Sequence, residues 1–144
     1  MDHTIWIELA LLLFLAAAAC EDYRCRKLPA ALICAGGAAG LVLRFLFDRE
    51  DLQDMILGIG IGAVMLLISY ATREALGYGD GLLMGAAGIY LGGVHTLVLL
   101  MCSLLTAAIG SIVLLGTKRK KGKDQIPFAP FVLGGFVLMK GVFQ

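Results

Sequence analysis

The sequence predicts an all-α membrane protein with six transmembrane helices in a single domain, residues 1–144. Two observations lead to this prediction. The chain is 60% hydrophobic, 16% charged and has a mean hydropathy of +0.90, whereas soluble domains are about 45–50% apolar. Its charged residues also cluster and leave long apolar runs between them, in which six apolar segments can be distinguished. In lipid, a chain satisfies its backbone hydrogen bonds by forming helices, so apolar segments of this kind are typical of a helical bundle.

The apolar segments cover approximately residues 5–20, 30–47, 55–71, 81–94, 96–116 and 128–143. We expect the fourth and fifth to be joined by a turn at residues 92–95, "GGVH". The sixth begins at Pro127 and Pro130, and proline suits the first turn of a helix. Basic residues follow the first segment instead of preceding it, unlike an export signal, so we expect this segment to be retained as a helix.

The basic residues predict the orientation of the helices. Nine of the twelve lysines and arginines lie in the connections after the first, third and fifth segments, which share one side of a six-helix bundle. The positive-inside rule makes that side cytoplasmic. We therefore expect a multi-pass protein of the cell's inner (cytoplasmic) membrane with both termini extracytoplasmic. The basic run at 118–123 sets topology and could also contact anionic lipid; a nucleic-acid partner is not expected.

Glycines recur at helical spacing in three of the segments. In the fourth segment they form one stripe, and small residues of this kind allow membrane helices to approach closely. The pattern predicts that the fourth helix packs tightly inside the bundle. The glycines concerned are Gly81, Gly85, Gly88 and Gly92, with the pairs Gly36 and Gly40, and Gly58 and Gly62.

Cysteine and histidine spacing does not indicate a metal centre. The four cysteines form no CxxC pair, and the two histidines are isolated, whereas zinc sites have closely spaced ligands. We expect no metal and no cofactor.

Two acids are candidates for catalysis. Asp22 follows the first apolar segment and Asp80 opens the fourth, so the predicted topology places both on the cytoplasmic side. Two close carboxyl groups share a proton: the charged one can take a proton from water while the neutral one polarises a peptide carbonyl. Gly77 and Gly79 beside Asp80 could allow a substrate backbone to approach. Asp80 could also be a helix N-cap, and Glu21 is a neighbouring alternative to Asp22.

Three motifs resemble those of a known family. "GYGD" at 77–80 resembles the GxGD signature of membrane-embedded aspartic peptidases. "DYRCRKLP" at 22–29 resembles the D-x-R-x-R-x-[IL]-P segment of type IV prepilin peptidases, and "IPFAPF" at 126–131 resembles their I-P-[FY]-x-P-[FY] segment. The motifs occur in the family's order, and together they span nearly the whole chain.

The resemblance implies an aspartic endopeptidase that removes the basic leader peptide from type IV prepilin or pseudopilin precursors at the cytoplasmic membrane face. It implies that Asp22 and Asp80 are catalytic, without a metal. The other residues that match the family motifs are Gly77, Gly79, Arg24, Arg26, Pro29, Pro127 and Pro130.

The sequence departs from the family at some positions. Ala30 and Leu82 stand where the family often has asparagine and lysine, and the first connection, residues 21–29, is short and has no tetracysteine set. We therefore expect a short form without the methyltransferase region. Two alternatives stay open: a small proton- or ion-coupled transporter, since acids within membranes also line ion paths, and a catalytically silent pilus-assembly protein.

Overall fold

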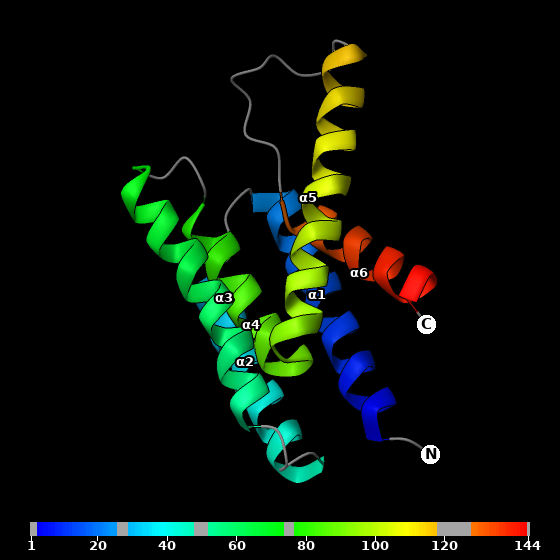
Figure 1. The fold of residues 1–144 in the computed structure, drawn as a ribbon. Coiled ribbons are helices and arrows are strands. Elements are labelled where there is room, and N and C mark those ends of the chain that lie inside the picture. The colour runs from blue at the N-terminus through cyan, green and yellow to red at the C-terminus, as the bar shows by residue number, and fades with distance from the viewer. Residues whose placement is uncertain (1–2, 26–28, 48–51, 74–76, 118–127, 144) are drawn as a thin grey trace.

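The computed structural model describes residues 3–25, 29–47, 52–73, 77–117 and 128–143, and within these ranges the chain forms six helices (Figure 1). They are α1 (His3–Cys25), α2 (Ala30–Phe47), α3 (Leu52–Ala71), α4 (Tyr78–Leu91), α5 (Gly93–Gly116) and α6 (Ala129–Phe143). The all-helical prediction is confirmed, and each predicted segment corresponds to one helix.

In the described part of the chain, four helices are long and apolar enough to cross a membrane: α1, α2, α3 and α5. The protein is therefore an integral membrane protein. Helices α4 and α6 have 14 and 15 residues. At 1.5 Å per residue they are about 21–23 Å long, which is shorter than the roughly 30 Å hydrocarbon core of a bilayer. Six complete spans thus stay a prediction.

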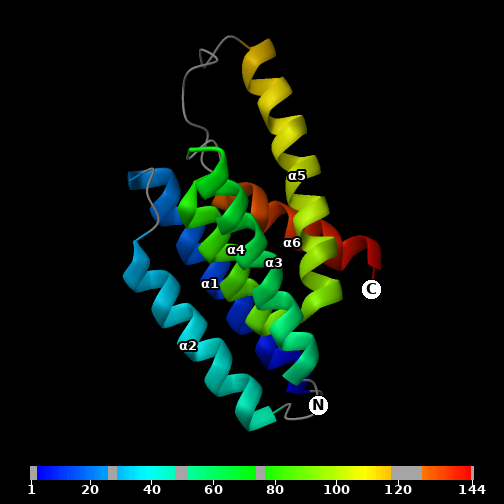
Figure 2. The ribbon, with the colours of Figure 1, turned by 60° about the vertical axis from the view of Figure 1, so that its left-hand side comes forward.

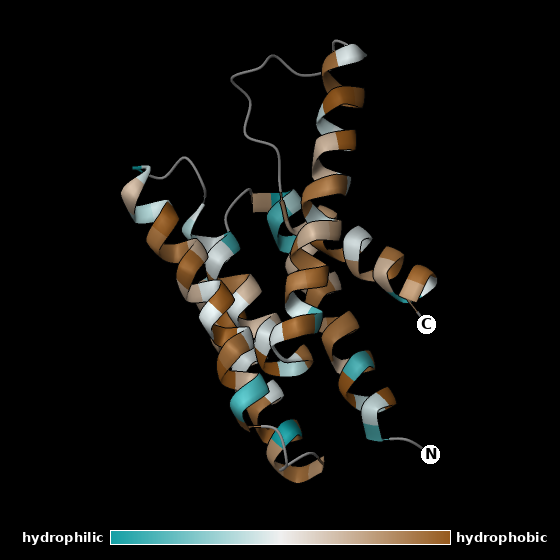
Figure 3. Cartoon of the chain, viewed as in Figure 1, coloured by the Kyte–Doolittle hydropathy of each residue, from teal (hydrophilic) through white to brown (hydrophobic). Residues whose placement is uncertain are grey.

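Hydropathy is distributed along the helices as a bilayer requires. Figure 3 shows apolar colour over most of the helices, with the hydrophilic residues gathered toward helix ends. Helices α1 and α3 end, and α2 and α4 begin, at the same end of the bundle (Figures 1 and 2). The C-terminal part of α5 extends beyond the other helices, and its side chains Leu105, Ile109 and Ile112 are exposed.

Helix α4 lies at the centre of the bundle, as the glycine stripe predicts. It contacts α1, α2, α3 and α5, and Leu83, Met84 and Ala87 are completely buried. Against α3 the approach is backbone to backbone. A Cβ atom added at Gly62 of α3 would lie 2.5 Å from the Gly85 nitrogen and 2.9 Å from the Gly81 carbonyl oxygen. Small residues therefore bring α3 and α4 together, as is common in membrane bundles.

The turn between α4 and α5 is shorter than the sequence predicts. Residues 92–95 were expected to form it, but α5 already begins at Gly93, and Gly92 alone separates the two helices. Gly92 has φ +80°, a conformation that glycine adopts without steric cost. This single residue reverses the chain, so Val94 and His95 belong to the first turn of α5.

A polar cluster holds this turn in place. The buried Arg44 guanidinium of α2 donates to the carbonyl oxygens of Tyr90, at 3.0 Å, and Ile89, at 3.4 Å. Asp54 of α3 accepts a hydrogen bond from the Gly93 N–H at 2.9 Å, and Arg44 and Asp54 pair at 3.9 Å. The negative end of α4 thus meets a cation and the positive end of α5 meets an anion, the favourable arrangement for both helix dipoles.

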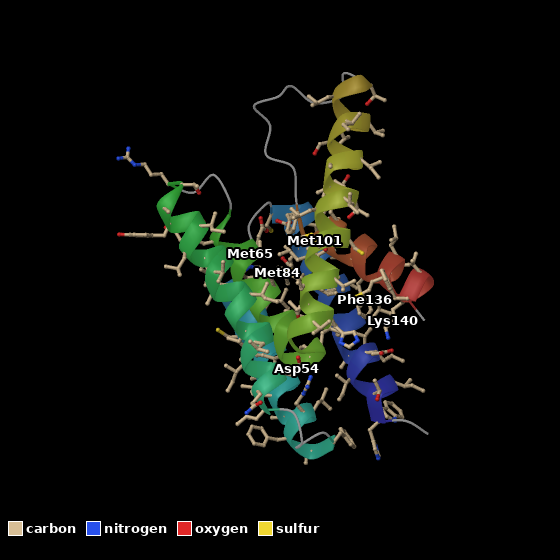
Figure 4. The ribbon with its side chains drawn as sticks, viewed as in Figure 1. Asp54, Met65, Met84, Met101, Phe136 and Lys140 are labelled. Atoms are coloured by element: carbon tan, nitrogen blue, oxygen red, sulfur yellow. The ribbon has the colours of Figure 1, made fainter. Side chains whose placement is uncertain are left out.

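Helix α6 packs on α1 and α5. Near its C-terminal end, Lys140 forms an ion pair with Glu8 of α1. Figure 4 labels Lys140 and Phe136 on the side of α6 that meets α1, and Phe136 is buried.

Candidate active site

Asp22 lies in the last turns of α1 and is buried, with 6% of its surface exposed. Its Oδ2 atom accepts a hydrogen bond from the backbone N–H of Ala129, the first residue of α6, at 3.0 Å. The neighbouring Glu21 points elsewhere. It is partly exposed, and its carboxylate is 3.9 Å from the Cys25 sulfur atom on the same helix. Of the two adjacent acids, the structure directs Asp22 into the bundle.

Asp80 lies in the first turn of α4 and is partly buried. The N-cap of this helix is Gly77, in an extended conformation, and no side-chain capping hydrogen bond is formed there. The N-cap interpretation of Asp80 is therefore wrong, because the helix begins at Tyr78 and its N-cap is Gly77. A Cβ atom at Gly77 would lie 3.3 Å from Oδ2 of Asp80. The carboxyl group thus lies over the helix start, where glycine leaves room for it.

The two carboxyl groups interact electrostatically. Asp80 precedes the apolar segment 81–94 and belongs to none of the four long spans. Burial, and then the nearby charge of Asp22, raise the pKa of Asp80 from 3.8 to about 7. Both effects disfavour the ionised form of a carboxyl group. Asp22 and Asp80, 58 residues apart in sequence, therefore form a pair in which Asp80 readily keeps a proton near neutral pH.

Apolar side chains lie beneath this pair. Met84 follows Asp80 by one helical turn and is completely buried, and Met65 of α3 is buried as well. Figure 4 labels both on the inner part of the α3 and α4 bundle. The two acids therefore lie at the polar end of an apolar core.

The remaining motif residues have varied positions. Arg24 is exposed in the last turn of α1. Pro29 precedes α2, and its carbonyl oxygen accepts hydrogen bonds from Leu32, at 3.1 Å, and Ile33, at 3.4 Å. Pro130 lies in the first turn of α6, as predicted. Gly79 lies in the first turn of α4. Arg26 and Pro127 lie outside the described residues.

Sequence reasoning missed one group at the site, the N–H of Ala129. A backbone donor has no side-chain signature. A usable signal existed in the "IPFAPF" motif, however, because Pro130 has no N–H, and the donors at the start of α6 are correspondingly few.

The apolar helical bundle defines the class, an integral membrane protein, and two acids, Asp22 and Asp80, lie near one end of it. The family follows from comparison with known proteins. The model of the type IV leader peptidase family matches residues 9–115. The chain therefore belongs to the type IV leader peptidase family, and the peptidase family named by the sequence motifs is confirmed.

Two curated relatives carry the name prepilin leader peptidase/N-methyltransferase. One, from Pectobacterium carotovorum subsp. carotovorum, is 28% identical over 138 residues, which are 91% of this chain and 50% of the relative. The other, from Aeromonas salmonicida (strain A449), is 29% identical over 107 residues, which are 69% of this chain and 37% of the relative. The chain thus spans half or less of the length of these relatives. The comparison with solved structures found no significant match.

Proposed function

We propose that the chain is a GxGD-type aspartic endopeptidase that removes the basic leader peptide from type IV prepilin or pseudopilin precursors. Cleavage takes place at the cytoplasmic face of the inner membrane, with Asp22 and Asp80 as the catalytic residues. The observation that carries this proposal is the interaction of these two carboxyl groups at one end of the bundle. The names of the curated relatives support the substrate class.

The surroundings of the two acids favour different protonation states. Asp22 accepts a backbone hydrogen bond at the start of α6, and a helix N-terminus favours negative charge. Asp80 has a raised pKa and holds the shared proton. The mechanism therefore starts with the proton on Asp80 and with Asp22 as the carboxylate.

Cleavage then proceeds by general acid–base catalysis. A water molecule between the carboxyl groups gives a proton to Asp22 as its oxygen attacks the peptide carbonyl carbon, while Asp80 donates its proton to the carbonyl oxygen. The tetrahedral intermediate returns that proton to Asp80, and the carbon–nitrogen bond breaks as Asp22 passes its proton to the leaving amine. Both acids recover their starting states.

The start of α4 suits an extended substrate. Gly77 has extended backbone geometry, and Asp80 is only partly buried. A peptide bond within a helix is shielded by its own hydrogen bonds, so the cleavage site unwinds before it enters.

The exposed Arg24 and Arg73 lie at the ends of α1 and α3, at the same end of the bundle as the acids. Under the positive-inside rule this arrangement supports a cytoplasmic site.

Cleavage of a prepilin precursor by the purified protein in detergent or liposomes tests the proposal. Wild type should release the leader, whereas Asp22→Asn and Asp80→Asn should each lose cleavage because neither amide can exchange a proton. Glu21→Gln is the matched control, since it removes a carboxylate one residue from Asp22, and it should cleave like wild type.

Cleavage by either aspartate variant at the wild-type rate would remove that residue from the mechanism. If wild type cleaves no precursor of the type IV class, the transporter and the silent assembly protein become the better interpretations. Proton or ion flux through the same liposomes would separate those two.

A further inference from the structure

We propose that the backbone N–H of Ala129 is a positioning group for catalysis: it fixes the Asp22 carboxylate so that one oxygen is held and the other faces the water and Asp80. This inference rests on the proposed peptidase function and adds a residue to it. The bond joins two segments 107 residues apart, Ala129 N–H to Asp22 Oδ2, at 3.0 Å.

The sequence at the start of α6 leaves this donor for Asp22. Pro130 has no N–H. The N–H groups of Phe131 and Val132 donate to the Phe128 carbonyl oxygen at 2.9 and 3.1 Å. The first turn of α6 therefore satisfies two of its own donors and offers the Ala129 N–H to α1. A helix start normally has several unpaired N–H donors. Because Pro130 has no N–H, fewer backbone groups at the start of α6 can donate to Asp22.

Burial makes the contact strong and directional. Ala129 is completely buried and Asp22 nearly so. A hydrogen bond to an ionised carboxylate is about twice as strong as one between neutral groups, and exclusion of water strengthens it further. With Oδ2 engaged, rotation of the carboxylate breaks the bond, so Oδ1 is directed toward the remaining open side of the site.

The start of α6 is itself held by its neighbours. The hydroxyl of Thr106, on α5, donates to the Phe131 carbonyl oxygen at 3.0 Å. At the other end of α6, Lys140 pairs with Glu8 of α1. The spacing from Glu8 to Asp22 is 14 residues, about four helical turns, so both polar contacts use one face of α1. The contacts Ala129–Asp22 and Lys140–Glu8 thus fix the register of α6 on α1, and this register sets the position of the Ala129 N–H.

The first test variant removes the backbone N–H of residue 129. Ala129→Pro deletes the donor while proline fits the first position of a helix. Ala129→Gly retains the donor and deletes the methyl group, and is the matched control. Loss of a hydrogen bond to a charged group corresponds to about a 10- to 100-fold change. We expect kcat for prepilin cleavage to fall by about that factor in Ala129→Pro, with KM unchanged, and Ala129→Gly to remain near wild type.

Because the proline ring could disturb this buried site, a second variant is needed. Replacing Ala129 by L-lactic acid turns its amide into an ester, which removes the N–H and keeps the methyl group. The ester should show the same loss of kcat at unchanged KM, without loss of the folded monodisperse protein in size-exclusion chromatography.

The outcomes separate this inference from the proposed function. If wild type cleaves and Asp22→Asn does not, the proposed function holds. An ester variant that then cleaves at the wild-type kcat, or that changes KM alone, overturns the positioning role. If wild type itself cleaves no precursor, both the proposed function and the positioning role fall.

Discussion

The contact between α3 and α4 at Gly62 provides the sharpest prediction about how the fold supports the site. A Cβ atom at this position would meet backbone atoms of α4, the Gly85 nitrogen at 2.5 Å and the Gly81 carbonyl oxygen at 2.9 Å. Ordinary contacts of a Cβ atom begin near 3.4 Å. Backbone cannot rotate away as a side chain can, so Gly62→Ala must displace α4 by about 1 Å, next to Asp80.

Two effects follow from this displacement. Overpacking a tightly packed contact lowers the free energy of unfolding by about 1–3 kcal/mol. For a chain of this size, each kcal/mol lowers Tm by about 2–4 °C. A misplacement of a catalytic group by about 1 Å can reduce the rate by about 100-fold. We therefore expect Gly62→Ala to lower both Tm and kcat/KM for prepilin cleavage.

Gly60→Ala is the matched control. Gly60 lies on the same helix, and a Cβ atom there would have no heavy atom within 4 Å. Both substitutions change helix propensity equally, so the difference between the two variants isolates the steric effect. Thermal unfolding in detergent, monitored by fluorescence-detected size-exclusion chromatography, measures Tm. A prepilin cleavage assay measures kcat/KM. Equal Tm and equal kcat/KM for the two variants would refute the reasoning.

Three further predictions concern protonation, the ion pair and the turn. Cleavage should slow as the pH rises through about 7, because Asp80, whose pKa is raised to about 7, then loses its proton; a rate–pH profile that rises or stays flat across this range would contradict the assignment. Lys140→Met should lower Tm by the equivalent of about 1 kcal/mol, because it leaves the half-buried Glu8 carboxylate without its partner, and adding Glu8→Gln should restore part of the loss; no recovery in the double variant would count against the pair. Gly92→Ala should cost about 1–3 kcal/mol in thermal unfolding because φ is +80° there, whereas Gly134→Ala, with open space around it, should not; equal Tm values would contradict this.

Much of the architecture could be predicted from the sequence, because a bilayer imposes a simple pattern. Apolar runs bounded by charges mark the helices, and the helix bounds agree with the predicted segments to within a few residues. The spacing of Gly81, Gly85 and Gly88 predicted the close approach of α4, since glycine at helical spacing presents a flat strip of backbone. Successive predicted helices cross the membrane in opposite directions, and this alternation predicted that Asp22 and Asp80 lie at one end of the bundle.

Other features depend on backbone geometry that side-chain patterns do not encode. The end of the turn at Gly92 could not be predicted from the sequence, because Val94 and His95 fit the start of a helix as readily as a turn. Asp80 was a candidate N-cap, but the helix begins at Tyr78 and its N-cap is Gly77, whose extended backbone and not a side chain sets the boundary. The pairing of Arg44 in α2 with Asp54 in α3 could not be predicted either, because no sequence spacing marks it.

The central claim is that Asp22 and Asp80 work as one unit on one water molecule. A double-mutant cycle measures this most directly: kcat/KM for prepilin cleavage by wild type, Asp22→Asn, Asp80→Asn and the double variant. Groups that act as a unit show strongly non-additive losses, so the double variant should be no slower than either single variant. Losses that multiply, or a single variant that keeps the wild-type rate, would contradict the account.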